Sequence, residues 1–272
     1  MSIESSPVKP LTQAARRRMV AGNWKMNGSI EANERLLEGI VPALHATAVA
    51  GGVQIVICPP FPYLGQARGA LAGADGLPGP IALGAQNVAA QSPGAFTGEV
   101  AAQMLADLGC TWVIIGHSER RALFGDTDEV VAAKCARALE QNLGVILCVG
   151  ETMDERDQGR AESVVASQLA ACAPVLGGVA ADRVVIAYEP VWAIGTGKTA
   201  TPAIAQQMHA FIRQRLVAGG WADPAATRIL YGGSVKSGNA GQLFSEPDID
   251  GGLIGGAALQ ADEFISICRA AA

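Results

Sequence analysis

Short apolar runs recur along the whole chain, separated by segments in which apolar positions return every three or four residues. The runs are rich in Val, Ile and Leu and show no polar alternation, which is typical of parallel strands covered on both faces. They occupy residues 19–23, 53–58, 81–86, 112–116, 145–150, 184–189, 229–232 and 252–255. The intervening segments have charged residues on one side and apolar residues on the other, which predicts amphipathic helices. Examples are residues 30–48, 127–142, 162–171 and 202–218.

Helix start signals agree with this pattern. Ser29 precedes the first helical segment, Asp126 or Thr127 precedes the second example, and Thr201 followed by Pro202 precedes the last. Successive apolar runs lie roughly 33 residues apart, the size of one strand–helix–strand unit. Eight such units with no linker between them predict a single-domain α/β protein with a (β/α)8 TIM barrel. On pattern alone, an open doubly wound sheet stays as the alternative.

Composition narrows the class of protein. The chain has 272 residues, 50% of them hydrophobic and 17% charged, which is enough apolar material for a large core. A net charge of −5 and 5% aromatic residues do not favour nucleic acid or an anionic membrane as partner. No apolar run approaches the roughly 18 residues that span a bilayer. The six cysteines are spread singly, so we expect reduced, mostly buried thiols and a cytoplasmic location.

The first residues differ from the rest of the chain. Residues 1–18 are polar, contain Pro7 and Pro10 and have no periodicity. We therefore expect residues 1–18 to form a flexible N-terminal extension and residues 19–272 to form the barrel domain. The arginines at 16–18 precede an apolar stretch that Asn23 and Lys25 interrupt, too short for a secretory signal.

Polar residues and glycines gather where the predicted strands end, which is the face on which barrels carry their active sites. Glu189 closes one strand and is followed by an apolar segment with Pro190 at one end and glycines at the other. That segment, residues 190–198, has the composition of a lid that covers a ligand and expels water. A carboxylate beneath a lid is a candidate general base for removing a proton from carbon.

Two further strand ends offer chemistry. His117 follows a strand and opens a helical turn, where the positive end of the helix dipole disfavours the charged imidazolium. Lys25 leaves the first strand beside Asn23 and supplies a local cation for an anionic ligand despite the net charge. Backbone N–H groups of the glycines, together with a serine hydroxyl, can hold a phosphate. The candidates for this role are Gly195, Ser234, Gly255 and Gly256.

Sequence motifs for other kinds of site are incomplete or absent. The segment 197–199 mimics the end of a P-loop, but Trp192 stands where the required glycine belongs. The histidines are dispersed, and no cysteine–histidine cluster has zinc spacing. We therefore expect no metal site.

Four segments, residues 22–28, 116–121, 187–197 and 231–234, together resemble the triosephosphate isomerase family, in the order that this family has them. The resemblance extends from about residue 18 to the C-terminus. It implies cofactor-free interconversion of dihydroxyacetone phosphate and D-glyceraldehyde 3-phosphate, an aldose–ketose isomerisation of glycolysis and gluconeogenesis. The chain departs from many relatives at Ala258, where they have Ser.

By this resemblance, Glu189 is the general base, His117 a neutral electrophile and Lys25 the cation that holds phosphate and offsets developing charge. Asn23 hydrogen-bonds a substrate oxygen, and Glu119 is a supporting acidic group. The closing lid consists of Pro190, Val191, Trp192, Ala193, Ile194, Gly195, Thr196, Gly197 and Lys198.

The resemblance also implies a homodimer, in which the long segment 86–99 inserts into the partner subunit and Thr97 approaches the partner's active site. The expected interface residues are Gln86, Asn87, Phe96, Thr97, Glu99 and Arg120. Two other functions stay open on the sequence alone. One is a different phosphate-binding barrel, such as a sugar-phosphate epimerase or aldolase, and the other is a catalytically silent barrel that acts as a scaffold.

Overall fold

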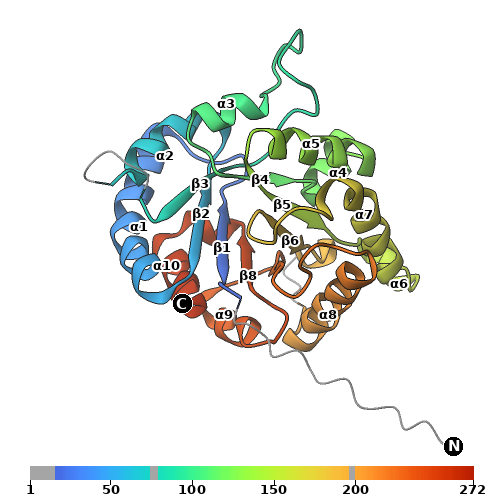
Figure 1. The fold of residues 1–272 in the computed structure, drawn as a ribbon. Coiled ribbons are helices and arrows are strands. Elements are labelled where there is room, and N and C mark those ends of the chain that lie inside the picture. The colour runs from blue at the N-terminus through green and yellow to red at the C-terminus, as the bar shows by residue number, and fades with distance from the viewer. Residues whose placement is uncertain (1–15, 74–78, 196–199) are drawn as a thin grey trace, which may run out of the picture.

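The computed structural model describes residues 16–73, 79–195 and 200–272 and has eight parallel strands closed into a barrel, in chain order. Figure 1 shows the strands at the centre and the helices around them. The strands are β1 (Met19–Asn23), β2 (Gln54–Cys58), β3 (Ile81–Ala85), β4 (Trp112–Ile115), β5 (Gly144–Val149), β6 (Val184–Tyr188), β7 (Arg228–Tyr231) and β8 (Gly251–Ile254). The predicted (β/α)8 barrel is confirmed, and the open sheet is excluded because β1 pairs with both β2 and β8.

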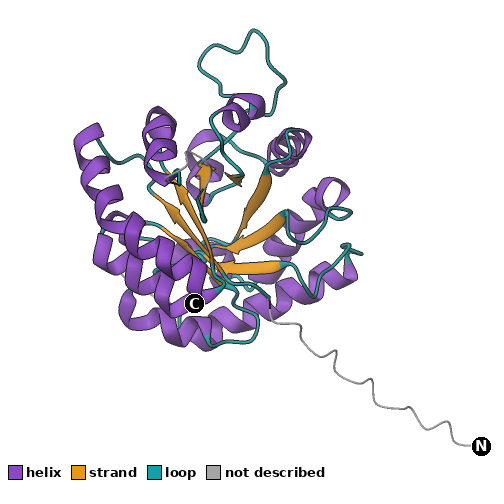
Figure 2. Cartoon of the chain, turned by 60° about the vertical axis from the view of Figure 1, so that its left-hand side comes forward, coloured by secondary structure: helices purple, strands orange, loops and turns teal. Residues whose placement is uncertain are grey.

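Helices lie between consecutive strands and cover the outside of the barrel (Figure 2). The longer ones are α1 (Ile30–Gly51), α2 (Leu64–Leu71), α5 (Asp128–Glu140), α7 (Ala161–Leu176), α8 (Pro202–Ala218), α9 (Ser237–Phe244) and α10 (Ala261–Ala271). The shorter ones are α3 (Ala102–Asp107), α4 (Ser118–Phe124) and α6 (Met153–Asp157). Three 3-10 turns complete the set, at Phe61–Tyr63, Val191–Ala193 and Gly256–Leu259.

The predicted helix starts are confirmed at the three positions named from sequence. The side-chain oxygens of Ser29, Thr127 and Thr201 accept the backbone N–H of the third helical residue of α1, α5 and α8. The prediction for α7 was too short, because the helix continues through Pro174 to Leu176. A proline removes one N–H and discourages helix in the residue before it, so the sequence signal for an end at this point is misleading.

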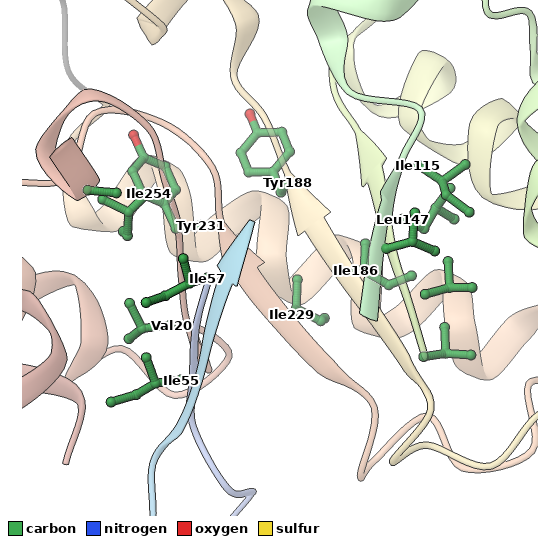
Figure 3. Close-up of a cluster of buried hydrophobic side chains, with 14 of the residues drawn as sticks. Val20, Ile55, Ile57, Ile115, Leu147, Ile186, Tyr188, Ile229, Tyr231 and Ile254 are labelled. Carbon is green, nitrogen blue, oxygen red and sulfur yellow. The ribbon is translucent and has the colours of Figure 1, made fainter. Parts of the chain in front are cut away.

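Alternate residues of each strand belong to two separate cores. One set faces the helices and joins helix side chains such as Leu37 and Ile212 in a continuous layer. Figure 3 shows part of this layer, with Val20, Leu147 and Ile186 among the labelled residues. The other set consists of strand residues alone and fills the barrel interior. Both sets are apolar, which explains why the strands have no polar alternation in the sequence.

Arginine side chains just before β1 donate hydrogen bonds to the barrel. Arg16 Nε donates to Asp250 Oδ1 at 2.6 Å, and its side chain is only 5% exposed. Arg18 donates to the carbonyl of Phe244 at 2.8 Å, and its own carbonyl accepts the Gln54 N–H. Residues 1–15 lie outside the described part of the chain, so the domain boundary after residue 18 stays a prediction, although contacts with the barrel already begin at Arg16.

Two expectations from composition can be compared with the described residues. All six cysteines are buried and free of disulfides. None of the helices that the structure describes has the length and apolar character to cross a membrane.

Candidate active site

A cavity of about 590 Å³ opens at the carboxyl ends of the strands. It brings together eight residues that the sequence assigns to one site although they come from five different parts of the chain. These are Asn23, Lys25, His117, Glu189, Gly195, Ser234, Gly255 and Gly256. The glycine and polar residues at the strand ends therefore share one cavity.

Glu189 follows β6 directly and is 2% exposed, so its carboxylate is almost entirely removed from water. Oε2 accepts the backbone N–H of Ser118 at 2.8 Å, and Oε1 lies 2.9 Å from His117 Nε2. The main chain is held by the hydrogen bond from Glu189 N–H to Val149 O. A buried carboxylate with one main-chain donor can exchange that partner for a proton on a ligand.

His117 lies at the start of α4, after a turn made by Gly116 with φ of 74°. This left-handed conformation favours glycine and directs the histidine into the cavity. His117 Nδ1 accepts the Glu119 N–H at 3.3 Å, so the ring proton is on Nε2, which faces Glu189. Burial lowers the pKa of His117, but the neighbouring carboxylates of Glu189 and Glu119 together offset this and the net pKa is raised.

Lys25 has a positive φ of 53°, which is unusual for a residue other than glycine. Its N–H donates to Asn23 Oδ1, and its carbonyl accepts from the Gln86 side chain at 2.9 Å. The ammonium group lies 2.5 Å from Glu119 Oε1, whose side chain is 45% exposed. Since a β-carbon on Gly255 would lie 3.2 Å from Lys25 Cε, the lysine side chain passes directly over that glycine backbone.

The rest of the cavity wall comes mainly from the segments that follow β7 and β8. It includes Gly232 and Gly233 after β7, which the sequence places beside Ser234 without assigning them a role. Ser234 Oγ donates to Ala193 O at 2.9 Å and so connects this wall to the predicted lid. The sequence missed three polar residues on the rim, namely Lys236, Gln260 and Glu263, because they lie in loops and helices beyond the strand ends.

A protein-family model described as Triosephosphate isomerase matches residues 18–271. The chain belongs to the triosephosphate isomerase family. A triosephosphate isomerase of Thiobacillus denitrificans is 54% identical over 257 residues, which cover 94% of this chain and 99% of the relative. One of Alcanivorax borkumensis is 54% identical over 253 residues (93% and 98%), and one of Hahella chejuensis is 53% identical over 256 residues (94% and 99%). The resemblance seen in the four sequence segments is thereby confirmed.

The predicted lid of this triosephosphate isomerase family member begins with the 3-10 turn Val191–Ala193. Trp192 Nε1 donates to Glu151 Oε1 at 2.9 Å, and the Tyr188 hydroxyl donates to the same oxygen at 3.0 Å. Glu151 is fully buried and was missed from the sequence, although its place just after β5 parallels that of Glu189 after β6. Thr196, Gly197 and Lys198 lie outside the described residues.

Residues 86–99, which the sequence analysis expects at the dimer interface, extend away from the barrel between β3 and α3 (Figures 1 and 2). Phe96, Thr97 and Glu99 are exposed on it. Gln86 and Asn87, at its base, are used within the chain, since Asn87 Oδ1 accepts from Lys134 and the Gln86 amide donates to main-chain carbonyls. Arg120 pairs with Asp126 of its own chain at 3.0 Å.

No metal cluster is evident in the described part of this family member. Among residues 16–73, 79–195 and 200–272, no three His, Cys, Asp or Glu side chains are grouped so that they could hold a metal ion.

Proposed function

We propose that this chain interconverts dihydroxyacetone phosphate and D-glyceraldehyde 3-phosphate by moving one proton between neighbouring carbons through an enediolate. The observation that carries the proposal is the facing pair of Glu189 Oε1 and His117 Nε2, 2.9 Å apart in a cavity that also contains Lys25. The name triosephosphate isomerase of the relatives supports the same substrates.

Glu189 is the general base in this proposal. Its carboxylate releases the Ser118 N–H and takes the proton from the carbon beside the substrate carbonyl. The electron pair of the broken C–H bond forms the C=C bond of the enediolate, and the carbonyl oxygen takes up the negative charge. The glutamic acid then returns the proton to the neighbouring carbon, so that no external acid, base or cofactor is consumed.

His117 acts as the neutral electrophile. With Nδ1 accepting the Glu119 N–H, the Nε2–H exchanges Glu189 Oε1 for the substrate oxygens and moves protons between them. A substrate that enters between His117 and Glu189 weakens the carboxylate effect that raises the histidine pKa, whereas the lowering effect of burial stays. The imidazole is therefore neutral when it meets the carbonyl.

Lys25 and the backbone of the glycines hold the charged end of the substrate. The Lys25 ammonium exchanges the exposed Glu119 carboxylate for the ligand and offsets charge that develops on the enediolate. Asn23 Oδ1 already accepts the Lys25 N–H, which leaves its Nδ2 as the donor to a substrate oxygen. Gly195, Ser234, Gly255 and Gly256 surround the phosphate in the same cavity.

The lid, residues 190–198, closes over the bound substrate, excludes water and restrains the enediolate from eliminating phosphate. Two contacts support a hinged segment. Trp192 is tied to the buried Glu151, and the carbonyl of Ala193 is tied to Ser234 on the phosphate side of the cavity. Closure then couples phosphate binding to the environment of Glu189, which immediately precedes the lid.

A homodimer completes the proposal. Large apolar side chains are exposed after β1, β3 and β4, on the arc of the barrel that runs from β1 through β2 to β4: Met26 at 97%, Phe96 at 45%, Leu123 at 73% and Phe124 at 66%. Such a group on one arc of the rim favours a protein interface. The extended segment 86–99 lies on the same arc and inserts into the partner subunit, with Thr97 near the partner's active site and Glu99 pairing with Arg120 across the interface.

The test is a coupled assay of glyceraldehyde 3-phosphate turnover with metal ions chelated. Glu189→Gln is expected to lower kcat by at least about 100- to 10,000-fold, since it removes a general base but keeps the side-chain volume. Glu34→Gln, an exposed glutamate on α1, is the matched control and retains activity. Absence of turnover in the folded, unmodified protein contradicts the proposal and returns attention to a scaffold or another phosphate-binding barrel.

A further inference from the structure

Gln168 is a polar residue in the apolar stripe of α7, where Val165, Leu169 and Cys172 are buried on the same face. Its side chain is 8% exposed and is directed at a single glycine. Gln168 Oε1 accepts the Gly150 N–H at 2.8 Å, and Gln168 Nε2 donates to Gly150 O at 3.1 Å. One amide side chain thus satisfies both main-chain groups of one residue, which holds that residue in both position and orientation.

Gly150 lies directly against the main chain of Glu189. A β-carbon on Gly150 would lie 1.8 Å from the Glu189 carbonyl oxygen, so only glycine permits this approach. The preceding residue, Val149, accepts the Glu189 N–H at 2.8 Å. The Glu189 backbone therefore packs against the residues at the end of β5, and Gln168 forms hydrogen bonds to one of these residues, Gly150.

Packing alone does not hold this region. A second cavity, of about 470 Å³, lies beside the first, and both are lined by Glu189. Gln168 and Gly150 also line the second cavity. Because this cavity adjoins Glu189, side-chain packing around the residue is incomplete here, and the Gln168 hydrogen bonds to Gly150 add to the bond from Glu189 N–H to Val149 O in restraining its backbone.

We infer that Gln168 is a positioning residue for the reaction: through Gly150 it fixes the Glu189 backbone so that the carboxylate meets the substrate carbon. The inference rests on the role proposed above for Glu189. A displacement of about 1 Å in a reacting group can lower a rate by roughly 100-fold, so a residue that touches no substrate can still govern the proton transfer. The residues proposed to hold the phosphate make none of these hydrogen bonds, so we expect phosphate binding to depend on them less than proton transfer does.

The test compares Gln168→Met with the unmodified protein. Methionine keeps the volume but loses both hydrogen bonds. We expect kcat to fall by about 10-fold or more, while KM and the inhibition constant of glycerol 3-phosphate stay within about twofold. Glycerol 3-phosphate carries the phosphate but has no carbonyl, so it reports on phosphate binding alone. The deuterium isotope effect on kcat, with substrate labelled at the carbon that loses the proton, should increase because proton transfer becomes slower than other steps.

Gln206→Met is the matched control. Gln206 of α8 also makes paired hydrogen bonds, donating to Asp248 Oδ2 at 2.8 Å and accepting the Asp248 N–H at 3.0 Å, but it does so before β8, away from the cavity. A merely structural effect would lower activity alike in both variants. Unchanged kcat and isotope effect in folded Gln168→Met would overturn the inference.

Gln168→Asn covers the case in which the methionine variant does not fold. It keeps a neutral amide beside the Gly150 main chain but is one methylene group too short to make both hydrogen bonds, so kcat should fall below that of the unmodified protein. A wild-type kcat in this variant contradicts the inference. Failure of the proposed function is separate from either result, because it shows as absence of turnover in the unmodified protein.

Discussion

The two buried histidines have surroundings that shift their pKa values in opposite directions. Burial lowers the pKa of His117, but the carboxylates of Glu189 and Glu119 together raise it further, so the net pKa is raised. His209 of α8 is fully buried, and desolvation lowers its pKa to about 4. His209 Nδ1 lies 3.1 Å from the carbonyl of Asp248, and Nε2 has no hydrogen-bond partner among the described residues. His209 therefore belongs to the fold and has to stay neutral, whereas His117 belongs to the site.

Acid should destabilise the fold through His209. The unfolded chain binds a proton at a pKa near 6.5, whereas the folded chain binds it only near 4, so stability falls as pH decreases between these values. The free energy of unfolding should decrease by about 2 kcal/mol from this residue alone between pH 7 and pH 5. Denaturant titrations at both pH values check this by comparison with His209→Gln, in which that share of the difference should vanish. An equal difference in both proteins would contradict the assignment.

The sequence located those site residues that end strands. Asn23, Lys25, His117 and Glu189 each follow an apolar run, and the barrel brings the ends of such runs to one face. Gln168 could not be located in this way because its role depends on which face of α7 meets β5. One signal was present: a polar residue at a position of the buried helical stripe, between Val165 and Leu169.

At the scale of elements, glycines occur both in turns and inside helices, and their backbone conformations differ. Gly159, between α6 and α7, has a φ of 69°, whereas Gly241 lies inside the helix α9. In both places an added β-carbon would meet no atom within 4 Å. The two residues therefore differ in backbone conformation and not in available space.

This contrast predicts opposite effects of the same substitution. Gly241→Ala should raise the free energy of unfolding by roughly 0.5–1 kcal/mol, because alanine loses less backbone entropy in a helix. Gly159→Ala should lower it by about 1–2 kcal/mol, because the left-handed conformation is strained for a residue with a β-carbon. Thermal or denaturant unfolding of the two variants provides the measurement. Stabilisation by both variants, or destabilisation by both, would contradict the prediction that backbone conformation decides the sign of the effect.

The strands were the elements that the sequence predicted best, because continuous burial on both faces leaves an uninterrupted apolar run. Their ends agree with the prediction to within about a residue or two. Gly116, Gly150 and Glu189 belong to the apolar runs but lie just beyond β4, β5 and β6, where all three line the second cavity and Glu189 also lines the first. The helices α2, α3 and α10 were not among the segments named from the sequence, and short helices such as α2 and α3 are stabilised mainly by what they pack against.

At the scale of the whole molecule, the proposed homodimer makes a direct prediction. Light scattering should give a mass of twice the 27.9 kDa of the chain. Leu123→Glu should weaken the dimer, because it places a charge within the exposed apolar arc. Val217→Glu, which changes a similarly exposed apolar residue (62%) on the outer surface of α8, is the control and should leave the mass unchanged. A fully active monomer would contradict the proposed interface.

The pairing of β1 with β8 closes the barrel, and it affects how the chain folds during its synthesis. Arg16 and Asp250, which form a hydrogen bond just before these two strands begin, are 234 positions apart in the sequence. A ribosome releases β1 first and β8 nearly last, so one edge of β1 stays without its partner through most of synthesis. The first strand to emerge is thus the one that must wait longest to be covered, and completion of the barrel follows translation of the final strand.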